Sequence, residues 1–413
     1  MSDDQNYKTA ESLRLRSIDA LRGAAAIGVV FYHALAQDSA PDNLFRYPVR
    51  AIQLLSSFGY IGVFLFFVIS GFCIHLRWAR AQAAGEEARI NFGAFWKRRL
   101  VRLYPPYAIA LSLYLALTAV TVGIKLTGSF VYDLGMHVFM LHNLDWKTCY
   151  TINGVFWTLA IEEQLYLAYF LLLFLRRRLG WTTTLLICLA VRAGWMLFSH
   201  ALWLRTDFGI PVPEAAASHW FTWALGAIAV EALFGLITLP AWTRNLPLAA
   251  ILIVMASITS NALWYIPKDT AFHNISWFLI HPMWGLGFFI LVNRAVLAER
   301  HWFQSRRLPI IISVFATLGV FSYSMYLTHE LVIMQSWQFV SYSLPQIGNV
   351  FLIVLPAVIL FSWMFFWVFE RPFMKKVKFE KAGEKLDDNS ASPLSEGAHS
   401  LEYKGNVVQA SAN

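Results

Sequence analysis

Long apolar segments recur along almost the whole of this chain and constrain its fold more than any other feature. Ten stretches are long and apolar enough to cross a bilayer as helices, which takes about 20 residues. They lie at roughly 18–37, 58–76, 103–123, 155–175, 181–199, 219–238, 247–266, 272–292, 309–334 and 347–369. Only 14% of the residues are charged, against about 25% in a typical soluble domain. The sequence therefore predicts an all-α, polytopic protein of the lipid bilayer with about ten transmembrane helices.

The positive charges indicate how these helices are oriented. If the N-terminus lies in the cytoplasm, most of the 33 Lys and Arg residues fall on cytoplasmic segments. Since Lys and Arg accumulate on that side of membrane proteins, the pattern favours an N-in, C-in orientation and an even number of spans. The same rule accounts for the net charge of +8, so we expect no binding of nucleic acid.

The composition divides the chain into three regions. Residues 1–17 are expected to form a cytoplasmic N-terminal segment and residues 18–374 the transmembrane domain. Residues 375–413 are rich in Ser, Asn, Gly, Glu and Asp, which predicts a disordered cytoplasmic tail. The outer loop 124–154 contains MHVFMLHNL, which is too short to span the bilayer and either dips into it or lies on its surface.

The first apolar segment, RSIDALRGAAAIGVVFYHALA, carries ionisable residues on one face. At 100° per residue, Asp19, Arg22 and His33 fall within about 60° of one another. Arg22 and His33 are three turns apart, roughly 16 Å along the axis. Ionisable groups inside a span are costly and tend to face a bundle interior or a water-filled cavity. The stripe favours a functional path, while an Asp19–Arg22 ion pair and a helix–helix hydrogen bond of His33 are the structural alternatives.

Two further segments carry charges that a span would avoid. Arg99 and Arg102 share a helix face at the cytoplasmic end of the third span. They either follow the positive-inside rule or bind an anionic cofactor, since the forked guanidinium group suits phosphate. Glu162 lies inside the fourth span, a few residues after Trp157. A buried carboxylate needs a cationic partner or a watery cavity, so either a structural ion pair or a functional role explains it.

Small and hydroxylated residues complete the set of candidates. Ser70 lies in FFVISGF, where close helix packing is the simpler explanation. Tyr326 and His329 lie in FSYSMYLTHE, in the ninth apolar segment. The three cysteines are far apart and show no metal-ligand spacing, so no metal is expected.

Six motifs occur along the chain in a fixed order. They are R-S-I-D-A-L-R-G…H, F-F-V-I-S-G-F, R-R-L-V-R-L-Y-P-P-Y, W-T-L-A-I-E-E-Q-L-Y, Y-S-M-Y-L-T-H and F-E-R-P-F. Together they resemble integral-membrane acyltransferase family 3, which contains bacterial O-antigen and exopolysaccharide O-acetyltransferases and nodulation-factor acetylases. The resemblance covers about residues 14–374.

The resemblance implies an O-acetyltransferase of the bacterial inner membrane. Its donor would be an acyl-CoA, usually acetyl-CoA, and its acceptor a hydroxyl of a carbohydrate or glycolipid. By their match to the family motifs, the resemblance assigns catalysis to His33, Arg22 and Glu162, and acyl-CoA binding to Arg22, Arg99 and Arg102. Further candidates are Asp19, Ser70, Trp157, Tyr326 and His329. The competing class is a proton-coupled secondary transporter or exporter, with His33, Glu162 and His329 relaying protons.

Overall fold

The computed structural model describes residues 15–35, 46–86, 90–206, 214–267, 270–305, 309–339 and 346–374. Every regular element within these ranges is helical, which confirms the all-α prediction for them. Most of the predicted N-terminal segment, up to residue 14, and the predicted tail 375–413 lie outside the described residues, so both stay predictions.

The α-helices follow the order of the predicted apolar segments. They are α2 (Arg16–Leu35), α3 (Arg46–Ser56), α4 (Gly62–Ala83), α5 (Phe92–Thr121), α6 (Gly128–Val138), α7 (Trp157–Thr206), α8 (Ala216–Leu233), α9 (Leu246–Ala262), α10 (Ala271–Ser305), α11 (Ile310–Val320), α12 (Ser322–Ser336), α13 (Gln346–Asn349) and α14 (Leu355–Phe365). Two π-helical turns, η6 (Val350–Val354) and η7 (Phe366–Glu370), flank α14.

The described helices are those of an integral membrane protein. Seven are long and apolar enough to cross a membrane, or up to eight if the bent pair α11–α12 is one span. All ten predicted segments are helical over most of their length. The count of ten spans and the N-in, C-in orientation nevertheless stay predictions.

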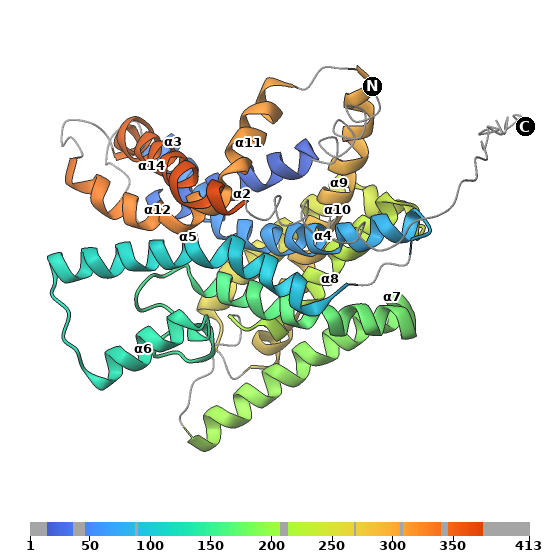
Figure 1. Cartoon of the computed structure of the whole chain (residues 1–413), viewed down its shortest axis with the longest axis horizontal. Helices are drawn as coiled ribbons and strands as arrows, with labels where there is room; N and C mark the ends of the chain where they lie inside the picture. Colours follow the sequence, from blue (N-terminus) through green and yellow to red (C-terminus); the bar gives the residue numbers. More distant parts are fainter. Residues whose placement is uncertain are drawn as a thin grey trace, which may run out of the picture.

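Helix α7 contains two of the predicted spans and reverses direction between them. Gly180 interrupts its helical backbone with φ 74° and ψ 174°. This left-handed region is readily open only to glycine, because a Cβ atom would clash there. Figure 1 shows the result: the two green arms of α7 diverge from a sharp turn. The predicted spans 155–175 and 181–199 therefore form the two arms.

Helices α4 and α8 cross at the centre of the protein. Every residue of α8 from Ser218 to Glu231 is buried. A Cβ atom on Gly71 would collide with the backbone of Trp223, and one on Gly226 with the backbone of Val68. The two glycines thus let the helix backbones touch, as small residues do between membrane helices.

Two contacts fix α2, which carries the predicted polar stripe. Glu299 of α10 accepts hydrogen bonds from the backbone N–H groups of Arg16 and Ser17 at 2.7 and 3.1 Å. A carboxylate in this place satisfies free amides and complements the helix dipole. Further along α2, Gly319 of α11 lies against the backbone of Asp19.

The segment predicted as one span at 309–334 is a bent pair of helices. Helix α11 ends at Val320, and α12 continues from Ser322 at an angle of 77°. The backbone of Phe321, with φ −114° and ψ 22°, leaves the helical conformation at the break. As a result, α12 turns inward from α11, and most of its residues are buried.

Candidate functional site

A cavity with three arginines in its lining lies between α2, α4, α5, α7 and α12. It contains about 530 Å³ of empty space. Its charged and hydroxylated lining includes Arg22, Arg99, Arg102, Glu162 and Ser70. Five residues singled out from the sequence thus meet at one place, although four different helices carry them.

The arginines give this cavity an excess of positive charge. The Nε atom of Arg102 is buried and has no hydrogen-bond partner in the described part of the chain. The guanidinium carbon of Arg99 lies 5.7 Å from the centroid of the Phe95 ring and 5.9 Å from that of Tyr166. Aromatic faces attract this cation while leaving its N–H donors open to a ligand. With one carboxylate against three guanidinium groups, the lining suits a phosphate-bearing ligand.

A second cavity of about 460 Å³ adjoins the first. Arg22, Phe66, Glu162 and Tyr323 line both cavities. Tyr326 belongs to the lining of the second. The two spaces therefore lead from the arginines towards the hydroxyl groups of α12.

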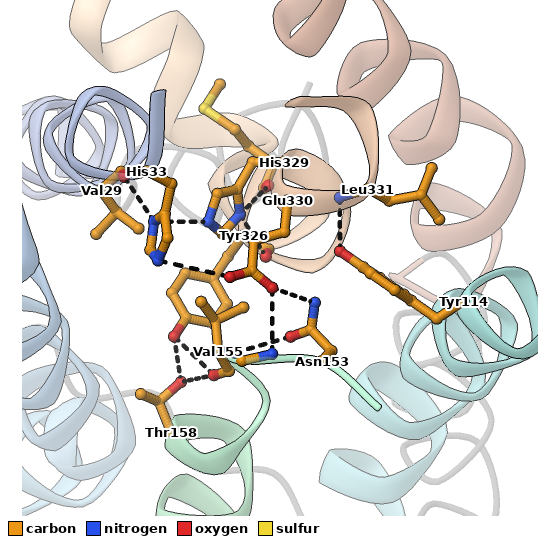
Figure 2. A network of polar contacts seen from close by, with 12 residues as sticks. Val29, His33, Tyr114, Asn153, Val155, Thr158, Tyr326, His329, Glu330 and Leu331 are labelled. Carbon is orange, nitrogen blue, oxygen red and sulfur yellow. Dashed lines mark hydrogen bonds and ion pairs between the residues drawn. The ribbon is translucent and has the colours of Figure 1, made fainter. Parts of the chain in front are cut away.

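His33 lies beyond the second cavity, in the last turn of α2. Its Nδ1 atom lies 2.9 Å from the carbonyl oxygen of Val29 and 3.3 Å from Nε2 of His329. The Nδ1 atom of His329 in turn lies 2.8 Å from the carbonyl oxygen of Tyr326. Figure 2 shows the two imidazoles in contact through one nitrogen of each ring, with their planes inclined at 60°. The His33 side chain is 20% exposed, so a small group can reach it.

Glu330 joins this histidine pair to the loop before α7. Its Oε1 atom lies 3.6 Å from Nε2 of His33. Its Oε2 atom accepts hydrogen bonds from the Asn153 side chain at 2.8 Å and from the Gly154 backbone N–H at 3.2 Å. In Figure 2 the carboxylate stands between the histidines and Asn153.

Tyr326 links the second cavity to the same loop. Its hydroxyl accepts a hydrogen bond from Thr158 at 2.6 Å and donates one to the carbonyl oxygen of Val155 at 2.9 Å. Thr158 and Tyr326 both line the second cavity. The start of α7 is thereby fixed against α12 at the place where the cavity approaches the histidines.

The structure brings most of the predicted site residues together. Arg22, Arg99, Arg102, Glu162 and Ser70 line the first cavity, and Tyr326 leads to the contact between His33 and His329. Asp19 and Trp157 are absent from both linings: Asp19 faces α11 through its backbone, and Trp157 packs against the main apolar core.

Three residues at the site are missing from the candidates chosen on the sequence. Glu330 carried a usable signal, because it is a carboxylate directly after His329 in an apolar segment. Asn153 lies in a loop, where no periodicity indicates which way a side chain points. In the sequence, Tyr323 cannot be told from any other aromatic residue of a span. In the structure it follows the bend at Phe321 and lines both cavities.

The fold and the site define an integral membrane protein whose apolar helices enclose an arginine-lined cavity and hold a partly exposed His33 against a buried His329. The family model described as "Acyltransferase domain" matches residues 15–367. The chain therefore belongs to this family of integral-membrane acyltransferases, as its six motifs predicted.

Several curated proteins are similar to parts of the chain. "O-acetyltransferase OatA" of Staphylococcus aureus (strain NCTC 8325 / PS 47) is 29% identical over 218 residues, which is 48% of this chain and 32% of that protein. "Nodulation protein 10" of Rhizobium leguminosarum bv. viciae is 28% identical over 199 residues, 45% of this chain and 51% of that protein. "Putative acetyltransferase ORF330" of Acidianus two-tailed virus is 29% identical over 151 residues, which is 36% of this chain and 37% of that protein.

The matches thus span about a third to a half of the length of these relatives. No solved structure matches the chain.

Proposed function

We propose that this protein is a membrane-bound O-acetyltransferase that moves an acetyl group from acetyl-CoA to a hydroxyl of a carbohydrate or glycolipid. The observation that carries the proposal is the pair of adjoining cavities that lead from three arginines to Tyr326, next to the contact between His329 and the partly exposed His33. An anion-binding end and a proton-accepting end are what a phosphate-bearing acyl donor and a hydroxyl acceptor require. The names of the Staphylococcus and viral relatives also indicate acetyl transfer.

The donor enters from the cytoplasm in this proposal. Arg22, Arg99 and Arg102 bind the phosphates of acetyl-CoA, because guanidinium groups form paired, charge-assisted hydrogen bonds with phosphate oxygens. The narrow pantetheine arm then follows the second cavity past Tyr326. Glu162 lines both cavities together with Arg22, and in this proposal its charge orients Arg22.

His33 acts as the general base. Neutral imidazole has an ordinary pKa near 6.5 and takes a proton readily at neutral pH. His33 Nε2 removes the proton of the acceptor hydroxyl, and the oxygen attacks the thioester carbonyl. A new C–O bond forms, the C–S bond breaks, and the proton passes from His33 to the departing thiolate. A covalent acyl-histidine relay is the variant of this scheme.

The acceptor is a cell-surface or secreted molecule that meets the enzyme at the bacterial inner membrane. With the proposed N-in, C-in orientation, Arg22 lies towards the cytoplasm and His33, at the other end of α2, towards the outer face. This arrangement would carry an acetyl group across the bilayer to an acceptor on the outer side.

A transfer assay with purified protein tests the proposal. The protein in nanodiscs is incubated with acetyl-CoA labelled in the acetyl group and with candidate glycans. Free CoA and label on the glycan are expected in equal amounts. A proton-coupled transporter instead moves an intact solute into proteoliposomes and consumes no thioester, so solute flux without CoA release would replace the enzyme proposal.

A further inference from the structure

Glu330 lies next to His33 but has no role in the transfer mechanism proposed above. Its two oxygens have different surroundings: Oε2 accepts hydrogen bonds from Asn153 and Gly154, whereas Oε1 lies 3.6 Å from Nε2 of His33. The Glu330 side chain is 22% exposed, so water screens it only in part. Two donors on one oxygen hold the carboxylate in place and direct the other oxygen to the histidine.

The hydrogen bonds of His33 determine which of its nitrogens carries the lone pair. Nδ1 lies 2.9 Å from the Val29 carbonyl oxygen, which only accepts hydrogen bonds, so Nδ1 carries a proton. In neutral imidazole the lone pair is then on Nε2. Nε2 is the atom that faces Glu330, so the carboxylate lies beside the nitrogen that gains a proton when His33 acts as a base.

Among the residues that the structure describes around His33, the other polar groups carry no negative charge. The His329 ring lies 5.0 Å from the His33 ring, and its Nδ1 atom is committed to the Tyr326 carbonyl. The Tyr32 ring also lies 5.0 Å away and meets the imidazole edge-on. Tyr114 accepts a hydrogen bond from the backbone N–H of Leu331, next to Glu330. Among these neighbours, Glu330 is the acid.

We propose that Glu330 is the positioning residue for His33: its carboxylate stabilises the imidazolium that forms when Nε2 takes the hydroxyl proton. The inference rests on the proposed transfer reaction. In that step the O–H bond of the acceptor breaks and an N–H bond forms at His33 Nε2. The imidazole becomes positively charged, with Nε2 3.6 Å from Oε1 of Glu330. An opposite charge within about 4–6 Å favours the charged form of an ionisable group. The departing CoA thiolate then takes this proton from Nε2, and His33 returns to its neutral form.

The loop before α7 holds the Glu330 carboxylate in its position beside His33. Asn153 and Gly154 precede α7 in the chain, whereas Glu330 belongs to α12, 177 and 176 residues further on. If the loop were displaced, Oε2 would lose both donors and Oε1 would lose its fixed direction. The loop thus contributes to the basicity of His33 without touching it.

Chemical modification of His33 tests the pairing without any need for turnover. Diethyl pyrocarbonate reacts with neutral imidazole, so the pH midpoint of His33 modification, followed by mass spectrometry, reports its protonation. In the full-length protein in nanodiscs, Glu330→Gln should lower this midpoint by about one pH unit, because the imidazolium loses its charged partner. Asn153→Ala keeps the carboxylate and removes one donor, so it should lower the midpoint by less.

The control for loss of one negative charge is Glu86→Gln, since Glu86 is exposed outside the site. It should leave the midpoint unchanged. An unchanged midpoint in a correctly assembled Glu330→Gln protein overturns the pairing, whatever the activity. A lowered midpoint in a protein without acetyl transfer keeps the pairing and instead removes the proposed function.

Where transfer from acetyl-CoA is measurable, Glu330→Gln should lower kcat about tenfold per pH unit of midpoint shift. The KM for acetyl-CoA should stay the same, because the arginines that bind its phosphates are remote from Glu330. A rise in KM with unchanged kcat would contradict the role of a positioning residue. Glu330→Asp, which retains the charge, should recover part of kcat.

Discussion

Nε2 of His329 lies 3.3 Å from Nδ1 of His33, although 296 positions separate the two residues in the chain. The contact exists because α12 turns inward at the 77° bend and brings its buried face against the end of α2. His33 is thereby held from two sides, by the Val29 carbonyl of its own helix and by an imidazole from another. An imidazole fixed in this way leaves one nitrogen, Nε2, outside these two contacts and facing Glu330.

The first prediction concerns the proposed base. His33→Ala should reduce acetyl transfer to background, because His33 Nε2 is the atom proposed to take the hydroxyl proton. The released CoA and the labelled product are measured together. His200→Ala is the matched control, since His200 is exposed on α7, and it should retain full activity. Near-normal turnover of His33→Ala would remove His33 from catalysis.

The second prediction concerns the arginine-lined cavity. Arg99→Glu or Arg102→Glu should raise the KM for acetyl-CoA at least tenfold, since the reversed charge repels phosphate where the guanidinium attracted it. Steady-state kinetics at varied acetyl-CoA measure this effect. Arg177→Glu, an equal charge change at an exposed residue of α7, should leave KM unaltered. If all three variants share the wild-type KM, the donor binds elsewhere.

The third prediction concerns a buried ion pair that joins α7 and α8. The Arg176 guanidinium donates to both Glu231 oxygens at 2.7 Å, and His75 lies 2.9 Å from the same carboxylate. Glu231 is fully buried, so Arg176→Met leaves it without its cation and should cost about 3 kcal/mol of stability. A lower melting temperature in detergent measures the loss.

Arg177→Met is the control for this pair, because Arg177 is exposed and should tolerate the change. Arg176→Lys should restore the stability only in part, since an ammonium group lacks the planar fork that engages both oxygens. Equal melting temperatures for Arg176→Met and the wild type would show that the pair contributes nothing to stability.

The fourth prediction concerns pH. Burial raises the pKa of Glu214, in the segment before α8, to about 7 from its ordinary value of 4.5. Below 4.5 the carboxyl is protonated in both the folded and the unfolded chain, and its contribution to stability is complete. As the pH rises through about 7, the folded state loses that advantage. The melting temperature should therefore fall between about pH 4.5 and 7 and less steeply in Glu214→Gln.

Tyr150 gives this pH effect a second check. Its hydroxyl donates a hydrogen bond to Glu214, which favours the ionised carboxylate and opposes the effect of burial. Tyr150→Phe should therefore move the pH window of the stability loss upwards. A window that stays in place would show that the titrating group is not Glu214.

The sequence by itself determined the helical membrane class and the family. Apolar stretches of about 20 residues form α-helices in lipid, because each backbone N–H and C=O group must find its hydrogen-bond partner within the segment. Period and spacing also placed Arg22 and His33 on one face of α2. The spacing also placed Arg99 and Arg102 on one face of α5, although the positive-inside rule by itself accounts for arginines at that end of a span.

Only the tertiary structure decided which of these groups meet. The pairing of His33 with His329 depends on the bend at Phe321, before which α11 packs closely against α2. No local pattern encodes either feature. Glu330 and Asn153 became neighbours through the packing of α12 against the loop before α7. Such contacts join residues far apart in the chain, so they follow from how the helices pack together rather than from the periodicity of any one of them.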